Sequence, residues 1–240
     1  MCFSAGASIT AGVLLTFAGT ETLRKVHKPS QIVFACIPLF FALQQFSEGV
    51  VWLTIPHKGY ADLQAVATYT FLVMAQFIWP ILVPLSVLLM EKNKTRKKVL
   101  WSLFIVGVIV SIYYLHGLVV YHARAEISFM HINYKYKRNF QSPFSDIPTA
   151  LYLIATLAPV FVSSVKRAYM LGVVTGLSAM VSVIFFNECL ISIWCFFAAV
   201  VSFVIYYTIR ESHKKFHYDR ELFRMKAEMD RVPLGKIPPN

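Results

Sequence analysis

Seven long apolar runs follow one another along this chain of 240 residues, and each is close to the length that crosses a bilayer. A hydrocarbon layer about 30 Å thick takes roughly 20 helical residues. Of all residues 57% are hydrophobic and only 15% are charged, so little is left for a soluble domain. The sequence therefore predicts an all-α polytopic membrane bundle with spans at residues 5–23, 31–55, 63–90, 99–121, 147–165, 168–187 and 189–209. Six spans remain the alternative, because only Asn187 and Glu188 separate the last two runs.

The basic residues predict the orientation of this bundle. Most of them follow the first, third, fifth and seventh runs, which places them on one side of a seven-span chain. These four segments hold 18 of the 23 lysines and arginines. Basic residues accumulate on the cytoplasmic side of membrane proteins. We therefore expect the N-terminus outside and the C-terminus in the cytoplasm.

Two pieces are expected to lie outside the transmembrane domain of residues 1–210. The outer loop, residues 122–146, contains a stretch of alternating apolar and polar residues from Ile127 onwards, which predicts a strand or short hairpin. The tail, residues 211–240, is basic and predicts a loosely amphipathic helix in solvent or among lipid headgroups, with docking of a protein partner as the alternative. Anionic membrane lipids account for the net charge of +11, so we expect no nucleic-acid partner.

Glu48 is the strongest pointer to a function, because it lies inside the second apolar run. An ionised side chain in hydrocarbon is so costly that it normally faces a bundle interior or a wet cavity. Gln44, Gln45 and Trp52 recur with Glu48 at steps of about one helical turn, so the four share one helix face. Two amides and an acid do not suit a lipid-facing stripe. We predict that this face looks inward and binds substrate.

Two further spans supply candidate binding residues. The third run contains Gln76 and Trp79, followed by two prolines that predict a kink or hinge. The fourth run contains Tyr113 and His116. At this depth His116 is expected to bond to Glu48, to relay a proton, to hold a cofactor, or only to pack against a tyrosine or the backbone.

Glu188 completes the candidate binding residues. The sequence Phe186-Asn187-Glu188 echoes Phe46-Ser47-Glu48, and each is followed by an apolar stretch and a tryptophan. This pattern predicts that the first three and last three spans are parallel repeats joined by the fourth, with a site at their interface. An exposed turn residue is the alternative for Glu188.

The sequence predicts no metal site, and the cofactor is unknown. The four cysteines form no CxxC pair and have no pair of histidines nearby. Cys2 and Cys189 are expected near the outer face, where an oxidising compartment allows a disulfide between them. His122 and His131 in the outer loop are surface residues or ligands of a metal or substrate. No GxSxG or HExxH motif marks an enzyme.

Three segments carry a resemblance. The opening Met1-Cys2-Phe3-Ser4-Ala5, the block Pro38 to Trp52 and Trp79-Pro80 with Pro84 together resemble an uncharacterised bacterial family of integral membrane proteins. The resemblance implies a bacterial cytoplasmic membrane and no particular reaction. The expected helix count and orientation are also similar to sugar carriers of the PQ-loop and SWEET kind, although the Pro-Gln pair of those carriers is absent.

Three functions fit these residues. In a small-solute or proton-coupled transporter, Glu48 exchanges protons, Gln44, Gln45 and Gln76 bond the solute, and Trp52 and Trp79 form stacking walls. In an intramembrane enzyme, Glu48 and His116 act as general acid and base. A membrane sensor, or an accessory subunit of a larger complex, needs only the bundle, the outer loop and the tail. The sequence favours the transporter and leaves the other two open.

Overall fold

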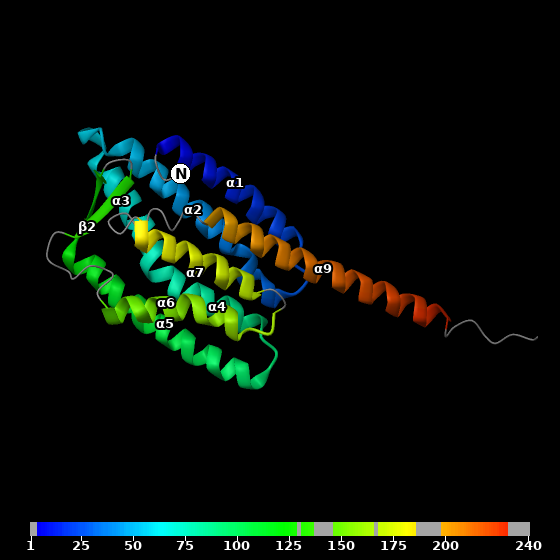
Figure 1. Cartoon of the computed structure of the whole chain (residues 1–240). Coiled ribbons are helices and arrows are strands. Elements are labelled where there is room, and N and C mark those ends of the chain that lie inside the picture. The colour runs from blue at the N-terminus through cyan, green and yellow to red at the C-terminus, as the bar shows by residue number, and fades with distance from the viewer. Residues whose placement is uncertain (1–3, 129–130, 137–145, 166–167, 186–197, 230–240) are drawn as a thin grey trace, which may run out of the picture.

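The computed structural model describes residues 4–128, 131–136, 146–165, 168–185 and 198–229, and in these ranges the protein is mostly helical (Figure 1). Its elements are α1 (Ala5–Arg24), η1 (Pro29–Gln31), α2 (Ile32–Thr54), η2 (Lys58–Tyr60), α3 (Ala61–Leu72), η3 (Val73–Ile78), α4 (Trp79–Met90), α5 (Lys94–Tyr121), β1 (Ala123–Ser128), β2 (His131–Tyr136), α6 (Asp146–Val162), α7 (Ala168–Phe185) and α9 (Ala198–Met229). Because α3, η3 and α4 follow one another without a break, the described ranges contain seven helices besides the short η1 and η2 turns.

Among the residues that the structure describes, three helical segments are long and apolar enough to cross a membrane: Pro29–Thr54, Ala61–Met90 and Lys94–Tyr121. They correspond to the second, third and fourth runs of the sequence. Ile147–Val162 and Ala168–Ser178 are apolar but shorter. These lengths indicate a membrane location. The count of seven spans, their orientation and the internal repeat stay predictions.

Residues 211–229 of the predicted tail are helical and continue the last described helix. From Ala198 the α9 helix runs through Arg210 to Met229 with no break at the predicted boundary. Figure 1 shows the C-terminal part of α9 projecting beyond the other helices. The start of the predicted seventh span, Glu188 and the proposed Cys2–Cys189 disulfide lie outside the described residues.

Glycines let α1 and α2 pack closely side by side (Figure 1). A Cβ atom added at Gly12 of α1 would lie 2.8 Å from the ring of Phe46, and one added at Gly49 of α2 would lie 2.7 Å from the side chain of Ile9. Small residues are typical of helix contacts in membranes, because they allow close approach. Gly49 therefore admits a neighbouring helix, and that helix is α1.

Two apolar clusters fill the bundle at opposite ends of α2. The first includes Ile37 of α2 and Ile205 of α9. The second includes Val51 near the end of α2 and Ile132 of the hairpin. Glu48 stands on α2 between these clusters. The polar face predicted from the sequence is therefore enclosed by apolar packing at both ends.

The outer loop contains the predicted hairpin. Strands β1 and β2 pair antiparallel, with Ile127 opposite Ile132. Ile132 and Tyr134 are buried on the same side of β2, and the Tyr134 ring stacks on Phe71 of α3 with centroids 4.8 Å apart. The alternation predicts the strands because one face packs on helices. The first strand begins earlier than expected, at Ala123, and the hairpin makes the fold mostly helical rather than all-α.

At the end of the bundle opposite the hairpin, the buried carboxylate of Glu91 links the turn between α4 and α5 to the segment that follows α6. Asn93 caps α5 by accepting from the N–H of Thr95 at 2.9 Å and of Arg96 at 3.1 Å, so α4 and α5 meet in a turn of three residues. Within this turn Glu91 Oε1 accepts from the N–H groups of the next two residues at 2.9 and 2.8 Å. The N–H of Ser164, after α6, donates to Oε2 at 2.7 Å, and its hydroxyl donates to Oε1 at 2.6 Å.

We expect the Glu91→Gln variant to lose about 1–3 kcal/mol of stability at neutral pH, because an amide leaves some of these buried donors unpaired. Burial raises the pKa of the Glu91 carboxyl, but the hydrogen bonds from Ser164, Asn93 and Lys92 outweigh it and hold the pKa below its ordinary value of 4.5. A lowered pKa stabilises the fold above pH 4.5, and this contribution is lost as the pH falls through the pKa of the folded state.

The measurement is the unfolding midpoint of detergent-purified protein between neutral and acid pH. Part of the acid-induced fall in wild-type stability should be missing in Glu91→Gln. The exposed Glu126, paired with Lys135 on the hairpin, provides the matched control Glu126→Gln, which should keep the wild-type pH profile. Identical profiles for all three proteins would show that Glu91 does not link the turns.

Candidate functional site

The polar face of α2 looks into the bundle, as the sequence predicts. The exposed fractions of Gln44, Gln45 and Glu48 are 0, 2 and 0%. Trp52, one turn further along α2, is half-buried. Burial of an acid and two amides in an apolar helix is costly unless polar partners are present. The face therefore marks a polar region in the bundle interior.

Trp79 ties this face to α4. Its indole Nε1 donates to Oε1 of Gln44 at 2.8 Å, and both side chains are buried. The Trp79 ring also packs against Phe41 in a tilted arrangement, with ring centroids 4.1 Å apart. The structure thus brings together Gln44 and Trp79, as expected. Gln44 is held by this bond, so Gln45 is the more available amide on α2.

Gln76 lies on the same side of the bundle and bonds to the hairpin. It is 5% exposed, and its Oε1 accepts from the hydroxyl of Tyr136 at 2.7 Å. Burial raises the pKa of Tyr136 to about 12, so the hydroxyl stays a donor at neutral pH. Tyr136 is the last residue of β2. The end of the hairpin therefore reaches the polar residues of the bundle directly.

The helix that carries Gln76 has an irregular backbone at this level. The η3 segment is π-helical, a conformation that is frequent at functional sites. The carbonyl of Ala75 accepts from the hydroxyl of Tyr152 on α6 at 2.7 Å. The carbonyl of Phe77 accepts from the hydroxyl of Ser111 on α5 at 2.8 Å. Hydroxyls of neighbouring helices thus bond to backbone carbonyls in this irregular stretch, whereas lipid tails could offer these carbonyls no donor.

Three buried donors around this face have no partner within the described part of the chain. They are the side-chain nitrogens of Gln45, Gln76 and Trp52. A buried N–H left without an acceptor costs about 1–3 kcal/mol. Two of the three are on α2, within about one turn of Glu48. The arrangement can donate hydrogen bonds to a polar guest and exchange a proton with it at the Glu48 carboxyl.

Two of the predicted binding residues lie elsewhere. Tyr113 and His116 are on the exposed face of α5, whereas Ser111 and Tyr114 are on its buried face. The exposed His116 does not join the buried Glu48, so the expected acid–base pair is not formed. Glu188 lies outside the residues that the structure describes.

The histidines of the outer loop do not form a metal site in the described ranges. Nδ1 of His122 lies 3.3 Å from the hydroxyl of Tyr69. His131 is half-buried in the hairpin, and this burial lowers its pKa. Across the described ranges, no group of three or more histidine, cysteine, aspartate or glutamate side chains is placed to hold a metal ion.

Sequence reasoning missed Tyr136 and Tyr152 as contributors to the site. Their hydroxyls bond to atoms 60 and 77 residues away in the chain. The alternation of the hairpin identifies Tyr136 as a strand residue but not as a donor to Gln76. The helical pattern of the fifth run likewise gives no reason to select Tyr152. These partners become visible only when the helices are packed together.

The fold and this site define a mostly helical protein with several apolar helices and a buried polar interior. The chain belongs to a family of unknown function, DUF6629, whose model matches residues 1–220. This match agrees with the resemblance to an uncharacterised family. No curated protein and no solved structure matches the chain.

Proposed function

We propose that this protein is a seven-span membrane transporter that couples movement of a small polar solute to movement of protons. The proposed orientation places the N-terminus outside and the tail in the cytoplasm, in the cytoplasmic membrane of a bacterium. The buried carboxyl of Glu48 supports this function above all, because it stands beside amide and indole donors in an apolar bundle. Intramembrane acids in such positions serve proton and ion pathways.

In this proposal each of these residues has a particular role. Glu48 is the proton-exchanging group. Gln45 and Gln76 are the solute donors, because their amide nitrogens have no partner among the described residues. Gln44 is a positioning residue, since Trp79 holds its oxygen. Trp79 then serves as a wall of the site rather than as a free stacking surface.

The irregular helix beside the site offers a route for conformational change. Pro80 and Pro84 follow the π-helical η3 segment, and neither can donate a backbone hydrogen bond. Broken or irregular helices next to a midplane site are typical of transporters, where they allow gating movements. The Tyr136–Gln76 bond links this segment to the hairpin. In our proposal, the hairpin closes the outer side and the bond breaks when that side opens.

One observation favours a second function, that of a sensor or accessory subunit. The α9 helix has 32 residues and extends beyond the bundle in Figure 1. A helix of this length with a basic C-terminal half suits a partner or a headgroup surface. The third alternative, an intramembrane enzyme, loses its expected acid–base pair because His116 is exposed. The likeness to PQ-loop and SWEET carriers stays a prediction.

The transporter is tested with purified wild-type protein in proteoliposomes that contain a pH-sensitive dye. Labelled monosaccharides, amino acids and small carboxylic acids are added singly, with and without an imposed pH gradient. We expect at least one class to accumulate under the gradient and to move protons, and both effects to vanish when an ionophore collapses the gradient. If none of these solutes accumulates or moves protons, the transport proposal is wrong and the sensor or accessory function takes its place.

A further inference from the structure

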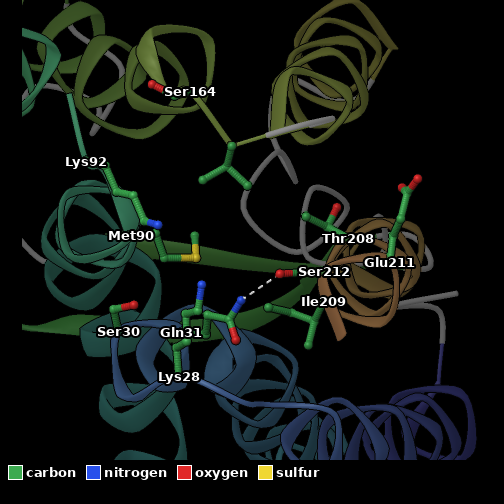
Figure 2. Close-up of a pocket in the computed structure, with 11 residues that line it drawn as sticks. Lys28, Ser30, Gln31, Met90, Lys92, Ser164, Thr208, Ile209, Glu211 and Ser212 are labelled. Atoms are coloured by element: carbon green, nitrogen blue, oxygen red, sulfur yellow. Dashed lines mark hydrogen bonds between the residues drawn. The ribbon is translucent and has the colours of Figure 1, made fainter. Parts of the chain in front are cut away.

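A second polar site lies at the end of the bundle opposite the hairpin. It is a cavity of about 430 Å³ between η1, the end of α4, the segment after α6 and the middle of α9 (Figure 2). This volume lies within the range of pockets that bind small molecules. The cavity is well separated from Glu48, because α2 begins beside it at Ile32 and Glu48 lies four turns further along.

Two lysines give the cavity its charge. Figure 2 shows the Lys28 and Lys92 side chains extending into it, Lys28 from the residue just before η1 and Lys92 from the α4–α5 turn. Neither lysine forms an ion pair with any residue that the structure describes. The carboxylate of Glu211, also in the lining, points away from both lysines in Figure 2. Two ammonium groups are therefore available to an anion.

Four other polar side chains of the lining, those of Gln31, Ser164, Thr208 and Ser212, are already engaged in hydrogen bonds. The Gln31 side-chain nitrogen donates to the hydroxyl of Ser212 on α9 at 3.0 Å, which ties η1 to α9 (Figure 2). The hydroxyls of Ser164 and Thr208 donate to Glu91 and to a backbone carbonyl. These bonds leave the lysines as the main groups that meet a ligand. They also preorganise the cavity, which lowers the entropic cost of binding.

The Glu91 carboxylate sets the position of one of the lysines. It accepts from the backbone N–H of Lys92 and from that of Ser164. Glu91 therefore ties the turn that carries Lys92 to the segment after α6, which also lines the cavity. Its negative charge is satisfied by those donors rather than by a lysine. The buried acid therefore holds this part of the cavity lining in place without neutralising the positive charge of the lysines.

We propose that this cavity binds a phosphate-bearing anion through Lys28 and Lys92. Lysine ammonium groups bind phosphate as strong point charges. Met90, Val165 and Ile209 add an apolar lining, which suits a phosphate attached to a small apolar group. Such a ligand is either the headgroup of an anionic lipid or a soluble phosphate compound. Basic pockets between transmembrane helices on the cytoplasmic side are suited to anionic headgroups.

The two sources are separated by two measurements on the full-length protein. Native mass spectrometry in detergent measures retention of added phosphatidylglycerol, with zwitterionic phosphatidylcholine as the lipid control. Thermal unfolding measures stabilisation by inorganic phosphate at constant ionic strength. The double variant Lys28→Gln with Lys92→Gln should weaken binding roughly tenfold or more, because it removes two charge-assisted contacts.

The matched control removes the same charge from the same two basic segments outside the cavity: Lys25→Gln with Lys94→Gln should bind like wild type. Lys28→Arg with Lys92→Arg should retain binding and shows that the site folds. Retention of phosphatidylglycerol alone identifies a headgroup site, and stabilisation by inorganic phosphate identifies a site for soluble phosphate. No binding of either probe, or equal losses in the control and the cavity variant, would overturn the proposal.

Discussion

Replacement of Glu48 by glutamine is expected to abolish proton-driven solute uptake while the protein stays folded. Glutamine has nearly the size and shape of a protonated glutamate, so it fits a site that is completely buried. It cannot release a proton, so a carrier that depends on Glu48 can no longer couple solute to a pH gradient. In proteoliposomes, uptake by Glu48→Gln should fall to the level of protein-free vesicles.

A second measurement distinguishes lost coupling from lost folding. Exchange of labelled for unlabelled solute across the membrane needs no net proton movement, so Glu48→Gln should retain it. The matched control is Asp62→Asn, an exposed acid in the first turn of α3, which should transport like wild type. Unchanged gradient-driven uptake in Glu48→Gln would show that Glu48 has a structural role only.

Much of the fold can be predicted from the sequence because burial follows regular periods. Gln44, Gln45 and Glu48 recur at helical spacing, and a polar stripe on an apolar helix has only the bundle interior to face. The hairpin follows from a period of two that places Ile132 and Tyr134 on one side. Both inferences depend on local spacing alone. The structure confirms both.

The partners of these residues could not be predicted from spacing. A helical period shows which residues share a face, but on α5 it does not fix which face turns inward. For this reason the sequence predicts His116 in the site, although Ser111 and Tyr114 occupy the buried side. The π-helical η3 segment could not be predicted from residue spacing either, because its backbone is stabilised by the Tyr152 and Ser111 hydroxyls from other helices.

The cavity at the other end shows the same limit. In the sequence, Lys28 and Lys92 are two of many basic residues beside membrane spans, and general attraction to headgroups explains them. Their convergence depends on the turn held by Glu91 and on the Gln31–Ser212 contact between η1 and α9. Such contacts join segments far apart in the chain, so they cannot be predicted from composition or from clusters of charged residues.

The packing of α4 on α5 depends on the absence of a side chain at Gly107. Pro84 has no N–H, so it cannot bond to the carbonyl of Pro80 one turn earlier in α4. Gly107 of α5 lies directly against that carbonyl. A Cβ atom at this position would overlap the Pro80 oxygen and lie 2.9 Å from its carbonyl carbon. The obstacle is backbone, so a side-chain rotation cannot relieve it.

We therefore expect Gly107→Ala to destabilise the protein by about 3 kcal/mol, at the upper end of overpacking costs. For a chain of this length, that loss lowers the unfolding midpoint by roughly 6–12 °C. Gly176→Ala on α7 is the matched control, because no atom of the described residues outside its own stretch of helix lies within 4 Å of its added Cβ atom. The control should match or slightly exceed wild-type stability, since alanine favours a helix. Equal midpoints for both variants in detergent would mean that α4 and α5 do not meet at this glycine.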